Sequence, residues 1–343
     1  MNAGADADPI GAAALRQCNS TLDGRGVRVA QVEAAAPGWQ TNPNTISQCG
    51  QPFAWICVQG VATNFPNSIG SESGHADEVA RQLLGASPSV AAIDNYEANF
   101  FTSAIIPDEQ PISAKIVNQS FASFIRNVSV DQDYDDYAAR LNVLFISGSG
   151  NTGRPKSPGT AFNTISVGAY GGATSIGPIS DGRCKPDITA PAAYSSFATP
   201  LVSGTAAILL QAAETDDACD IRTLKALLLN GARKPAGWTN SPSSPLDLRY
   251  GAGLVNAFNS YRQLHGGKVS DPARITSRCG WDFTALSSPT NEYHFELSGS
   301  KPFCFTATLT WLRNYGQTNI SNLDLLLFGA NGSLIASSRS QVD

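Results

Sequence analysis

The chain has 343 residues, a net charge of −5 and 42% hydrophobic residues. This length exceeds one average domain of about 100–200 residues. The negative net charge argues against a nucleic-acid-binding protein, because such proteins usually carry clustered basic charge. The 31 Gly and 20 Pro residues indicate many turns and loops, which argues against a coiled coil or a helical array.

Four apolar runs in the first half of the chain are typical of strands that are buried on both faces. They cover residues 26–33, 114–120, 142–147 and 164–169. Helical patterns lie between them, over residues 75–84 and 131–141. This alternation of strands and helices predicts an α/β fold with a parallel sheet.

Residues 188–213 contain no charged side chain. A membrane-spanning helix needs about 20 apolar residues, but Pro200, Gly204 and the many Ser and Thr residues argue against a span. We therefore expect a buried helix that starts near Ser196, with Pro200 close to its first turn. Two further helices are predicted over residues 220–232 and 252–264.

The pattern changes near residue 269. Residues 303–311 alternate between apolar and Thr side chains, and residues 323–328 form a second predicted strand before a turn at Asn331 and Gly332. This predicts a small all-β domain after the α/β domain. The expected organisation is an N-terminal extension (1–23), the α/β domain (24–268) and a C-terminal β domain (269–343) that is short enough to be incomplete.

The sulfur content is unusual, with seven Cys and a single Met, which is Met1. No Cys-x-x-Cys pair and no Cys/His spacing suits a zinc site. Cys49 and Cys57 lie close together in the sequence, and Cys279 and Cys304 flank part of the β segment. We expect two local disulfides of the kind that oxidising compartments favour, and at least one unpaired thiol.

The N-terminal residues 1–9 are polar and rich in Ala and Asp. They lack the basic start and the apolar run of a signal peptide. Because disulfides indicate an oxidising compartment, we expect a secreted protein whose signal has been removed, with Met1 added for expression. No membrane partner is expected.

Four polar side chains stand where predicted strands end or helices begin, which is where open α/β sheets place their ligands. They are Glu33, His75, Asn151 and Ser196. Together they supply the groups for acyl transfer. A hydroxyl is activated by an imidazole base, a carboxylate orients that base, and an amide N–H₂ with a backbone N–H holds the oxyanion.

At these residues the sequence resembles the subtilisin-like serine proteases, and the resemblance covers residues 24–264. Residues 75–80 (HADEVA) resemble the segment of the catalytic histidine, and residues 150–153 (GNTG) resemble the oxyanion-hole segment. Residues 195–200 (SSFATP) resemble the nucleophile segment. Two further matches are the stretch before the nucleophile and the closing segment of the catalytic domain, at 185–191 (KPDITAP) and 250–256 (YGAGLVN).

The resemblance implies a serine endopeptidase in which Ser196 is the nucleophile, His75 the base and Glu33 the orienting acid. It implies an oxyanion hole made of Asn151 and the backbone N–H of Ser196. It also implies that two segments of mostly small residues flank a substrate and leave room for a bulky side chain, namely Ser120, Phe121 and Ala122, and Ser147, Gly148, Ser149 and Gly150. The expected partners are polypeptide substrates, with no nucleic acid, and the expected state is a monomer.

Three departures from the family pattern stand out. Glu33 occupies the position of the usual Asp and is one methylene longer, although Glu serves this role in some other Ser-His hydrolases. Asp77, near a helix start that favours acids, is a rival orienting acid. Phe197 follows the nucleophile where the family usually has Met, and no inhibitory pro-region is recognisable before residue 24. These departures leave open a catalytically silent binding protein with the same fold.

The β segment resembles the C-terminal jelly-roll domain of certain secreted alkaline subtilases, through residues 308–311 (TLTW), 322–325 (NLDL) and the turn at 331–332. That resemblance allows a structural calcium with oxygen ligands from Asn322 and Asp324. Polar residues are common in turns, so we interpret these two as turn residues and expect no required cofactor.

A remote alternative is a dinucleotide-binding oxidoreductase, because residues 148–153 formally match Gly-x-Gly-x-x-Gly after a strand. That fingerprint needs a helix to follow, whose N-terminus meets the pyrophosphate. Pro155 and Pro158 argue against such a helix, and the nearest acid, Asp181, comes too late for the ribose. No Gly-x-Ser-x-Gly motif is present either, which argues against an α/β-hydrolase.

Overall fold

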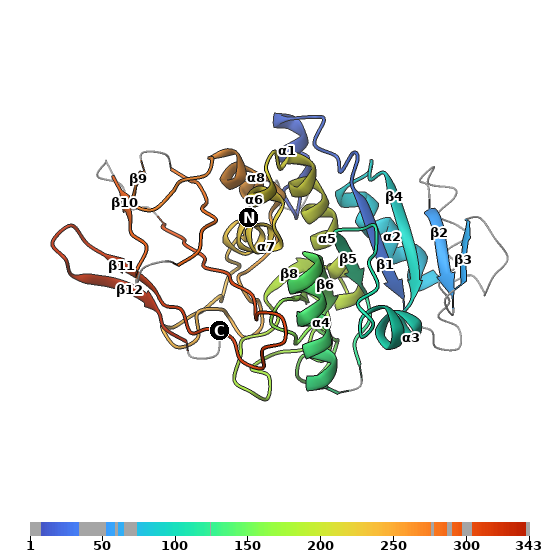
Figure 1. Ribbon diagram of the computed structural model, residues 1–343. Helices are drawn as coiled ribbons and strands as arrows, with labels where there is room; N and C mark the ends of the chain where they lie inside the picture. Colours follow the sequence, from blue (N-terminus) through green and yellow to red (C-terminus); the bar gives the residue numbers. More distant parts are fainter. Residues whose placement is uncertain are drawn as a thin grey trace.

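The computed structural model describes residues 8–33, 53–58, 61–64, 74–123, 125–275, 278–286, 290–296 and 304–340. The described strands form one large sheet of eight strands and two small sheets of two strands (Figure 1). The large sheet has the order β3-β2-β4-β1-β5-β6-β7-β8. Its strands are β1 (Arg28–Glu33), β2 (Phe53–Val58), β3 (Val61–Asn64), β4 (Ala92–Glu97), β5 (Ile116–Gln119), β6 (Leu144–Gly148), β7 (Ile165–Tyr170) and β8 (Ile188–Pro191).

Neighbouring strands of the large sheet pair in parallel, except that β3 runs antiparallel to β2 at the edge. Along β5 and β6 every residue is buried, as expected for strands that are covered on both faces. The predicted α/β fold with a parallel sheet is therefore confirmed.

The helices are α1 (Ala12–Cys18), α2 (Gly74–Ala86), α3 (Ala98–Phe100), the π-helical turn η2 (Phe101–Ile105), α4 (Val128–Leu141), α5 (Ser195–Ala212), α6 (Asp216–Cys219), α7 (Ile221–Asn230) and α8 (Ala257–His265). The predicted helices at 75–84, 131–141 and 220–232 are confirmed as α2, α4 and α7. The helix predicted from residue 252 begins only at α8, because Asn256 accepts a capping hydrogen bond from the Asn259 N–H.

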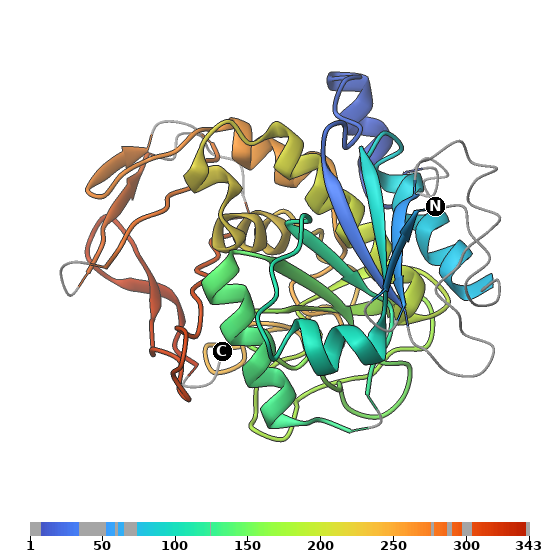
Figure 2. The ribbon, with the colours of Figure 1, turned by 45° about the vertical axis from the view of Figure 1, so that its right-hand side comes forward.

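The two longest helices, α4 and α5, cover opposite faces of the sheet (Figure 2). Neighbouring residues of a strand point to opposite faces. In β5, the Asn118 side chain accepts a hydrogen bond from Ser203 of α5, whereas the Gln119 side chain donates one to Tyr134 of α4. On the α4 face, Phe145 of β6 packs edge-to-face against Tyr134 at 4.9 Å between ring centroids.

Four strands of the sheet were not predicted from the sequence, namely β2, β3, β4 and β8. Strand β4 includes Asp94 and Asn95, both fully buried, so it lacks the apolar run that indicates a buried strand. Strand β8 lies at the beginning of the uncharged stretch, directly before α5. In that stretch the apolar pattern of the helix hides the pattern of the strand.

The described part of the predicted N-terminal extension packs on the α/β domain. The carbonyl of Ile10 accepts a hydrogen bond from the Ala257 N–H at 2.8 Å. Leu15 of α1 is fully buried in a cluster that includes Ile208 of α5. These contacts make residues 8–22 part of the same hydrophobic structure as α5 and α8.

The strand predicted over residues 303–311 is wrong for its described part, because residues 304–311 form no strand. Two of the alternating Thr side chains instead form hydrogen bonds with residues of α7. The Thr308 hydroxyl donates to the side chain of Asn230, and the Thr310 hydroxyl donates to the carbonyl of Arg222. The alternation thus reflects an extended segment that lies along a helix.

Four short strands lie beyond α8, at one end of the molecule (Figure 1). They are β9 (Ala273–Ile275), β10 (Tyr293–Phe295), β11 (Leu325–Phe328) and β12 (Leu334–Ser338). The hairpin of β11 and β12, with its turn at Asn331 and Gly332, agrees with the sequence pattern. The described residues of this region form two two-stranded sheets, which agree with a small β unit but do not support the expected jelly roll.

Arg313 anchors the C-terminal segment on the outer side of α4. Its side chain is 2% exposed and donates to the carboxylates of Asp135 and Asp136 at 3.0 and 2.7 Å. A third bond reaches the carbonyl of Gln132 at 2.7 Å. The backbone of Arg313 also exchanges two hydrogen bonds with the side chain of Asn163. A buried guanidinium thus joins segments that are about half the chain apart.

The cysteines whose side chains are described form no disulfide with one another, namely Cys18, Cys184, Cys219, Cys279 and Cys304. The expected bond between Cys279 and Cys304 is therefore wrong, and the Cys279 thiol donates instead to the carbonyl of Arg262. The expected partners Cys49 and Cys57 lie outside the residues whose side chains are described. None of the described helices is both long and apolar enough to cross a membrane.

Candidate active site

The four predicted site residues come from the carboxyl edge of the sheet and from two helix starts. Glu33 is the last residue of β1, and His75 is the second residue of α2. Asn151 follows the end of β6 by three residues, and Ser196 is the second residue of α5. Because these strands are parallel, their carboxyl ends lie at the same edge of the sheet, which is the usual ligand edge of such folds.

Glu33 and His75 form a buried pair. The Oε2 atom of Glu33 lies 2.8 Å from Nδ1 of His75. The Glu33 side chain is 2% exposed and the His75 side chain 16% exposed. The longer Glu side chain therefore reaches the imidazole from the end of β1. The bond also makes Nδ1 the protonated nitrogen, so that Nε2 of the neutral ring is left with its lone pair.

The pKa values of this pair follow from burial and contact. Burial raises the pKa of Glu33, and the hydrogen bond and charge of His75 offset only part of that rise. Burial lowers the pKa of His75, but the hydrogen bond and charge of Glu33 outweigh it, so the His75 pKa lies above its ordinary value of 6.5. The neutral imidazole that a general base requires is therefore populated at higher pH than in an ordinary histidine.

Two hydrogen-bond donors point to an oxyanion site at the start of α5. The Asn151 carbonyl oxygen accepts from both the N–H and the hydroxyl of Ser195, each at 2.9 Å. In the described part of the chain, the Nδ2 group of Asn151 and the backbone N–H of Ser196 donate to no other group. The first N–H groups of a helix lack intrahelical partners, so this one remains available to an anion.

The loop before Asn151 needs glycine. Gly150 has a φ of +100°, and a Cβ there would stand 2.7 Å from Oγ of Ser175. Gly148 packs against the first turn of α5, because a Cβ there would lie 3.3 Å from Oγ of Ser195. These small residues let the end of β6 approach α5 closely, which brings Asn151 to the start of the helix.

Pro200 shapes the backbone around Ser196. Proline has no N–H, so the Ser196 carbonyl four residues earlier loses its intrahelical partner. The hydroxyl of Ser120, just after β5, donates to that carbonyl at 2.7 Å. The Ser120 hydroxyl thus supplies a partner for this carbonyl and joins the first turn of α5 to the residue that follows β5.

A buried relay behind this tie was not predicted from the sequence. The Ser203 hydroxyl donates to the Asn118 carbonyl oxygen at 2.9 Å, and the Asn118 amide donates to the Ser120 hydroxyl at 3.0 Å. The relay fixes the direction in which the Asn118 amide points, so that Ser120 accepts from it and donates to Ser196. Only the structure reveals it, because Asn118 and Ser203 are 85 residues apart.

His75 and Ser196 lie in one neighbourhood without a mutual hydrogen bond in this structure. Phe197, the residue after Ser196, has its ring centroid 5.5 Å from that of His75. Bonds between nucleophile and base are often long in the absence of substrate and tighten when it binds. The structure thus pairs Glu33 with His75 and places Ser196 in the same neighbourhood.

The predicted substrate segments follow β5 and β6, which are adjacent in the sheet. Ser147, Gly148, Ser149 and Gly150 are all buried, whereas Phe121 and Ala122 are partly exposed. The Ser147 hydroxyl donates to the Gln119 side chain at 2.6 Å, inside the core. The Ser147 side chain therefore serves the core, and this segment can meet a substrate only through its backbone.

The nucleotide alternative fails on local structure. Residues 149–164 consist of turns, bends and irregular backbone, so no helix follows the end of β6. A pyrophosphate would therefore lack the helix N-terminus that the fingerprint requires. Among the described residues, no group of three or more His, Cys, Asp or Glu side chains could hold a metal ion.

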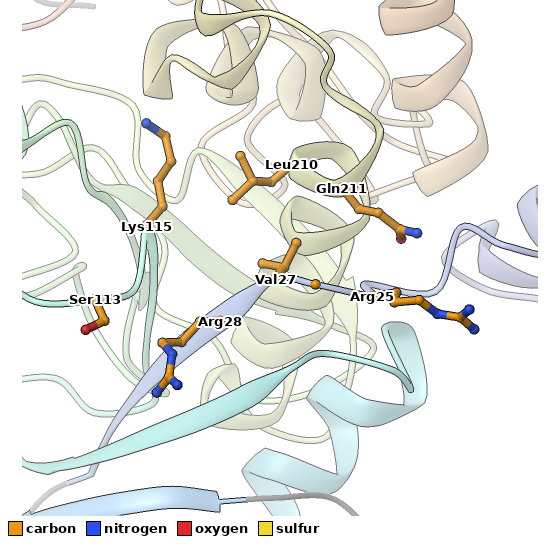
Figure 3. A pocket seen from close by; sticks show the side chains of 8 residues that line it. Arg25, Val27, Arg28, Ser113, Lys115, Leu210 and Gln211 are labelled. Atoms are coloured by element: carbon orange, nitrogen blue, oxygen red, sulfur yellow. The ribbon is translucent and has the colours of Figure 1, made fainter.

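An open hollow of about 360 Å³ lies at the other end of β1 (Figure 3). Its lining residues are Arg25, Gly26, Val27, Arg28, Ser113, Lys115, Leu210 and Gln211. The cations of this hollow have nearby acids: Arg25 pairs with Asp23 and Arg28 with Asp94. None of the predicted site residues lines it, so it is separate from the candidate active site.

Comparisons with known proteins find one family match and a similar fold. Residues 89–253 match the subtilase family, a range that includes Asn151 and Ser196. The fold is similar to that of a crystal structure of a lanthipeptide protease, with a TM-score of 0.52 and 15% sequence identity. That likeness covers 74% of this chain and 93% of the other. Glu33 and His75 lie outside the matched range, and the likeness to the lanthipeptide protease concerns the fold.

Proposed function

We propose that this protein is a serine endopeptidase that uses Ser196, His75 and Glu33 as its catalytic triad. The observation that carries the proposal is the pairing of two features at one edge of the sheet. A buried carboxylate holds the imidazole through Nδ1, and two available donors, from Asn151 and Ser196, lie at the start of α5. Acyl transfer needs both features.

In the proposed reaction, Ser196 Oγ attacks the carbonyl carbon of the scissile peptide bond while His75 Nε2 takes its proton. The carbonyl oxygen becomes an oxyanion that accepts from Asn151 Nδ2 and the Ser196 N–H. Glu33 stabilises the imidazolium. The C–N bond then breaks as His75 returns the proton to the leaving amine. Water repeats the sequence on the acyl-enzyme and releases the acid.

A catalytically silent binding protein with this fold is the second candidate. It is motivated by Glu33 in place of the usual Asp and by the unusual residues around His75 and Ser196. The intact Glu33–His75 bond favours the enzyme, because a silent protein has no need of it. Cleavage of a peptide library by the purified chain tests the proposal, with Ser196→Ala as the control. The proposal requires cleavage by the natural chain and its loss in the variant. Absence of cleavage in both would favour the binding protein.

Replacing Asn151 separates the oxyanion role from a structural one. Asn151→Asp keeps an oxygen that can accept from Ser195 but removes the Nδ2 donor. We expect kcat to fall by about 10²–10³ with little change in KM. Asn151→Ala should show the same kinetic loss and also lose about 1 kcal/mol of stability, because the helix-start acceptor is gone. Kinetics and thermal melts of both variants check this, and an active Asn151→Asp variant would contradict the oxyanion role.

The lack of methionine beyond Met1 predicts resistance to peroxide. Methionine beside the nucleophile is prone to sulfoxide formation, whereas Phe197 cannot form that product. Activity of the natural chain should survive a hydrogen peroxide treatment that inactivates Phe197→Met. Residual activity after matched treatments of the two proteins measures this. Equal losses would show that another group, such as an exposed thiol at Cys18 or Cys304, is the sensitive one.

A further inference from the structure

Three buried amide side chains lie in register across the large sheet. Gln31 of β1 pairs with Asn95 of β4 on one side and with Asn118 of β5 on the other, so the three side chains share one face. All three are fully buried. The helices α2 and α5 cover this face, because Gln31 bonds to α2 and Asn118 to α5. The row lies two residues behind Glu33, below the candidate active site.

Two members of the row bond to the helices that carry the catalytic groups. Asn118 belongs to the relay at the start of α5. The Gln31 side chain donates from Nε2 to the carbonyl of Ala76 at 3.0 Å, and Ala76 directly follows His75 in the first turn of α2. The third member, Asn95, has no hydrogen-bond partner for either side-chain atom in the described part of the chain.

Gln31 and Glu33 bridge the same separation, from β1 to the first turn of α2. They are two residues apart on one strand, so both side chains point to the same face. Glu33 reaches Nδ1 of His75 at 2.8 Å, and Gln31 reaches the following carbonyl at 3.0 Å. Each side chain is one methylene longer than Asp or Asn. The bond from Gln31 therefore holds the first turn of α2 at a distance that suits a Glu as the orienting acid.

The amide of Gln31 is unfavourable for the stability of the core. Its Oε1 atom is buried without a partner among the described residues, which costs free energy. The Ala76 carbonyl does not need Gln31, because inside a helix it accepts from the N–H four residues later. An apolar side chain would serve packing better at this position. The amide therefore points to a role in the site.

The far end of α2 is fixed by packing in which Gln31 has no part. Gly204 of α5 lies so close that a Cβ there would stand 2.6 Å from Cβ of Ala86 and 2.8 Å from the carbonyl of Leu83. The helix as a whole should therefore keep its place without Gln31. The first turn, which carries His75, is the part that would gain freedom.

We propose that Gln31 is a positioning residue for the catalytic base and holds the first turn of α2 where Glu33 can orient His75. The inference rests on the proposed function and deepens it. Glu33 sets the tautomer of the imidazole, and Gln31 sets the distance over which Glu33 acts. Without the amide, the bond between Glu33 and His75 is formed for a smaller share of the time, and the base is correctly oriented less often.

Gln31→Met removes the amide and keeps an unbranched side chain of similar volume. We expect kcat to fall about tenfold with little change in KM, because a loosely held base weakens the transition state more than substrate binding. The denaturant midpoint of unfolding should stay the same or rise, because a half-satisfied buried amide is gone. Steady-state kinetics and denaturant unfolding measure the two effects. A purely structural residue would show the opposite pattern, with lower stability and an unchanged kcat.

Asn95→Leu is the matched control. It removes another fully buried amide from the same row, in a residue that makes no hydrogen bond to α2 or α5 in the described part of the chain. We expect its kcat to stay within about twofold of the natural value, and its stability to hold or rise as in Gln31→Met.

NMR titration of His75 reports the positioning without turnover. The acids beside this ring are Glu33 on β1 and Asp77 on α2 itself, and α5 carries no charged residue. Glu33 raises the His75 pKa through its hydrogen bond and charge. Because Gln31→Met loosens that contact, the His75 pKa should fall in this variant and stay unchanged in Asn95→Leu. The Ser196→Ala chain is the background for all three measurements.

The outcomes separate this inference from the proposed function. Absence of cleavage by the natural chain would overturn the proposed function, while a lower His75 pKa in Gln31→Met would still support the positioning of the ring. An active natural chain whose kcat and His75 pKa are both unchanged by Gln31→Met would overturn only the positioning role. Equal losses of kcat in Gln31→Met and Asn95→Leu would overturn it as well.

Discussion

Glu33→Gln is expected to lower kcat by about 10⁴ while leaving the fold intact. Gln is isosteric with Glu, so the side chain still reaches His75 from the end of β1. Its amide cannot stabilise the imidazolium, and it can hold the ring in the wrong tautomer by donating to Nδ1. Steady-state kinetics of the purified variant measure the loss, and a thermal melt verifies that the protein is folded.

Asp77→Asn is the matched control for this result. Asp77 is the other buried acid near the histidine, but Nδ1 of His75 bonds to Glu33. We expect Asp77→Asn to lower kcat by less than about tenfold, against the loss of about 10⁴ for the triad acid. The opposite ranking of the two variants would transfer the orienting role to Asp77.

The pH dependence of kcat/KM is a second test of the contact between Glu33 and His75. Protonated His75 cannot act as a base, so kcat/KM should rise with pH through the His75 pKa. Since Glu33 keeps that pKa above 6.5, the midpoint of the rise should also lie above 6.5. In Glu33→Gln the raising contributions are lost and burial, which lowers the His75 pKa, remains. The midpoint for the residual activity should therefore move to lower pH.

Arg313→Ala is expected to lower the free energy of unfolding by roughly 3–5 kcal/mol. The substitution leaves the Asp135 carboxylate, 1% exposed, without its buried cation. Burial already raises the pKa of Asp135 and Arg313 partly offsets this, so removal of Arg313 raises that pKa further. Protonation relieves the uncompensated charge, and the loss of stability should therefore shrink as pH falls. Denaturant unfolding at two pH values measures both effects.

Arg339→Ala provides the control for charge removal in the same segment. The side chain of Arg339 is exposed, so its removal should change the stability by no more than about 0.5 kcal/mol. The double variant Arg313→Met with Asp135→Leu should recover much of the stability, because an apolar pair replaces a buried ion pair without leaving an unpaired charge. A fully stable Arg313→Ala variant would mean that the C-terminal segment is not anchored there.

Local patterns in the sequence were enough to predict the α/β core and to select the candidate site residues. Glu33, His75 and Ser196 each stand at the end of a strand or the start of a helix. In a parallel sheet those positions share one edge, so residues far apart in sequence could be expected to meet. The motif around Ser196 also predicts one local feature. Because Pro200 has no N–H, the Ser196 carbonyl can accept a hydrogen bond from a group outside the helix.

Features that depend on tertiary contacts were not predictable in this way. The relay from Ser203 through Asn118 joins a helix to a strand, and neither residue stands out in its own segment. The alternation at Thr308 and Thr310 has the period of a strand, but the two hydroxyls donate to residues at the two ends of α7. A period of two shows that alternate residues share an environment, without showing whether that environment is a sheet or a helix.

The central claim is that Ser196 is a nucleophile activated by His75 and Glu33. Labelling with a fluorophosphonate, followed by mass mapping of the adduct, tests it most directly, because the reagent needs an activated serine and stays on it. The account predicts one adduct, on Ser196, that forms rapidly in the natural chain and far more slowly in Glu33→Gln. A fresh preparation without an adduct, or with the adduct on another serine, would contradict it.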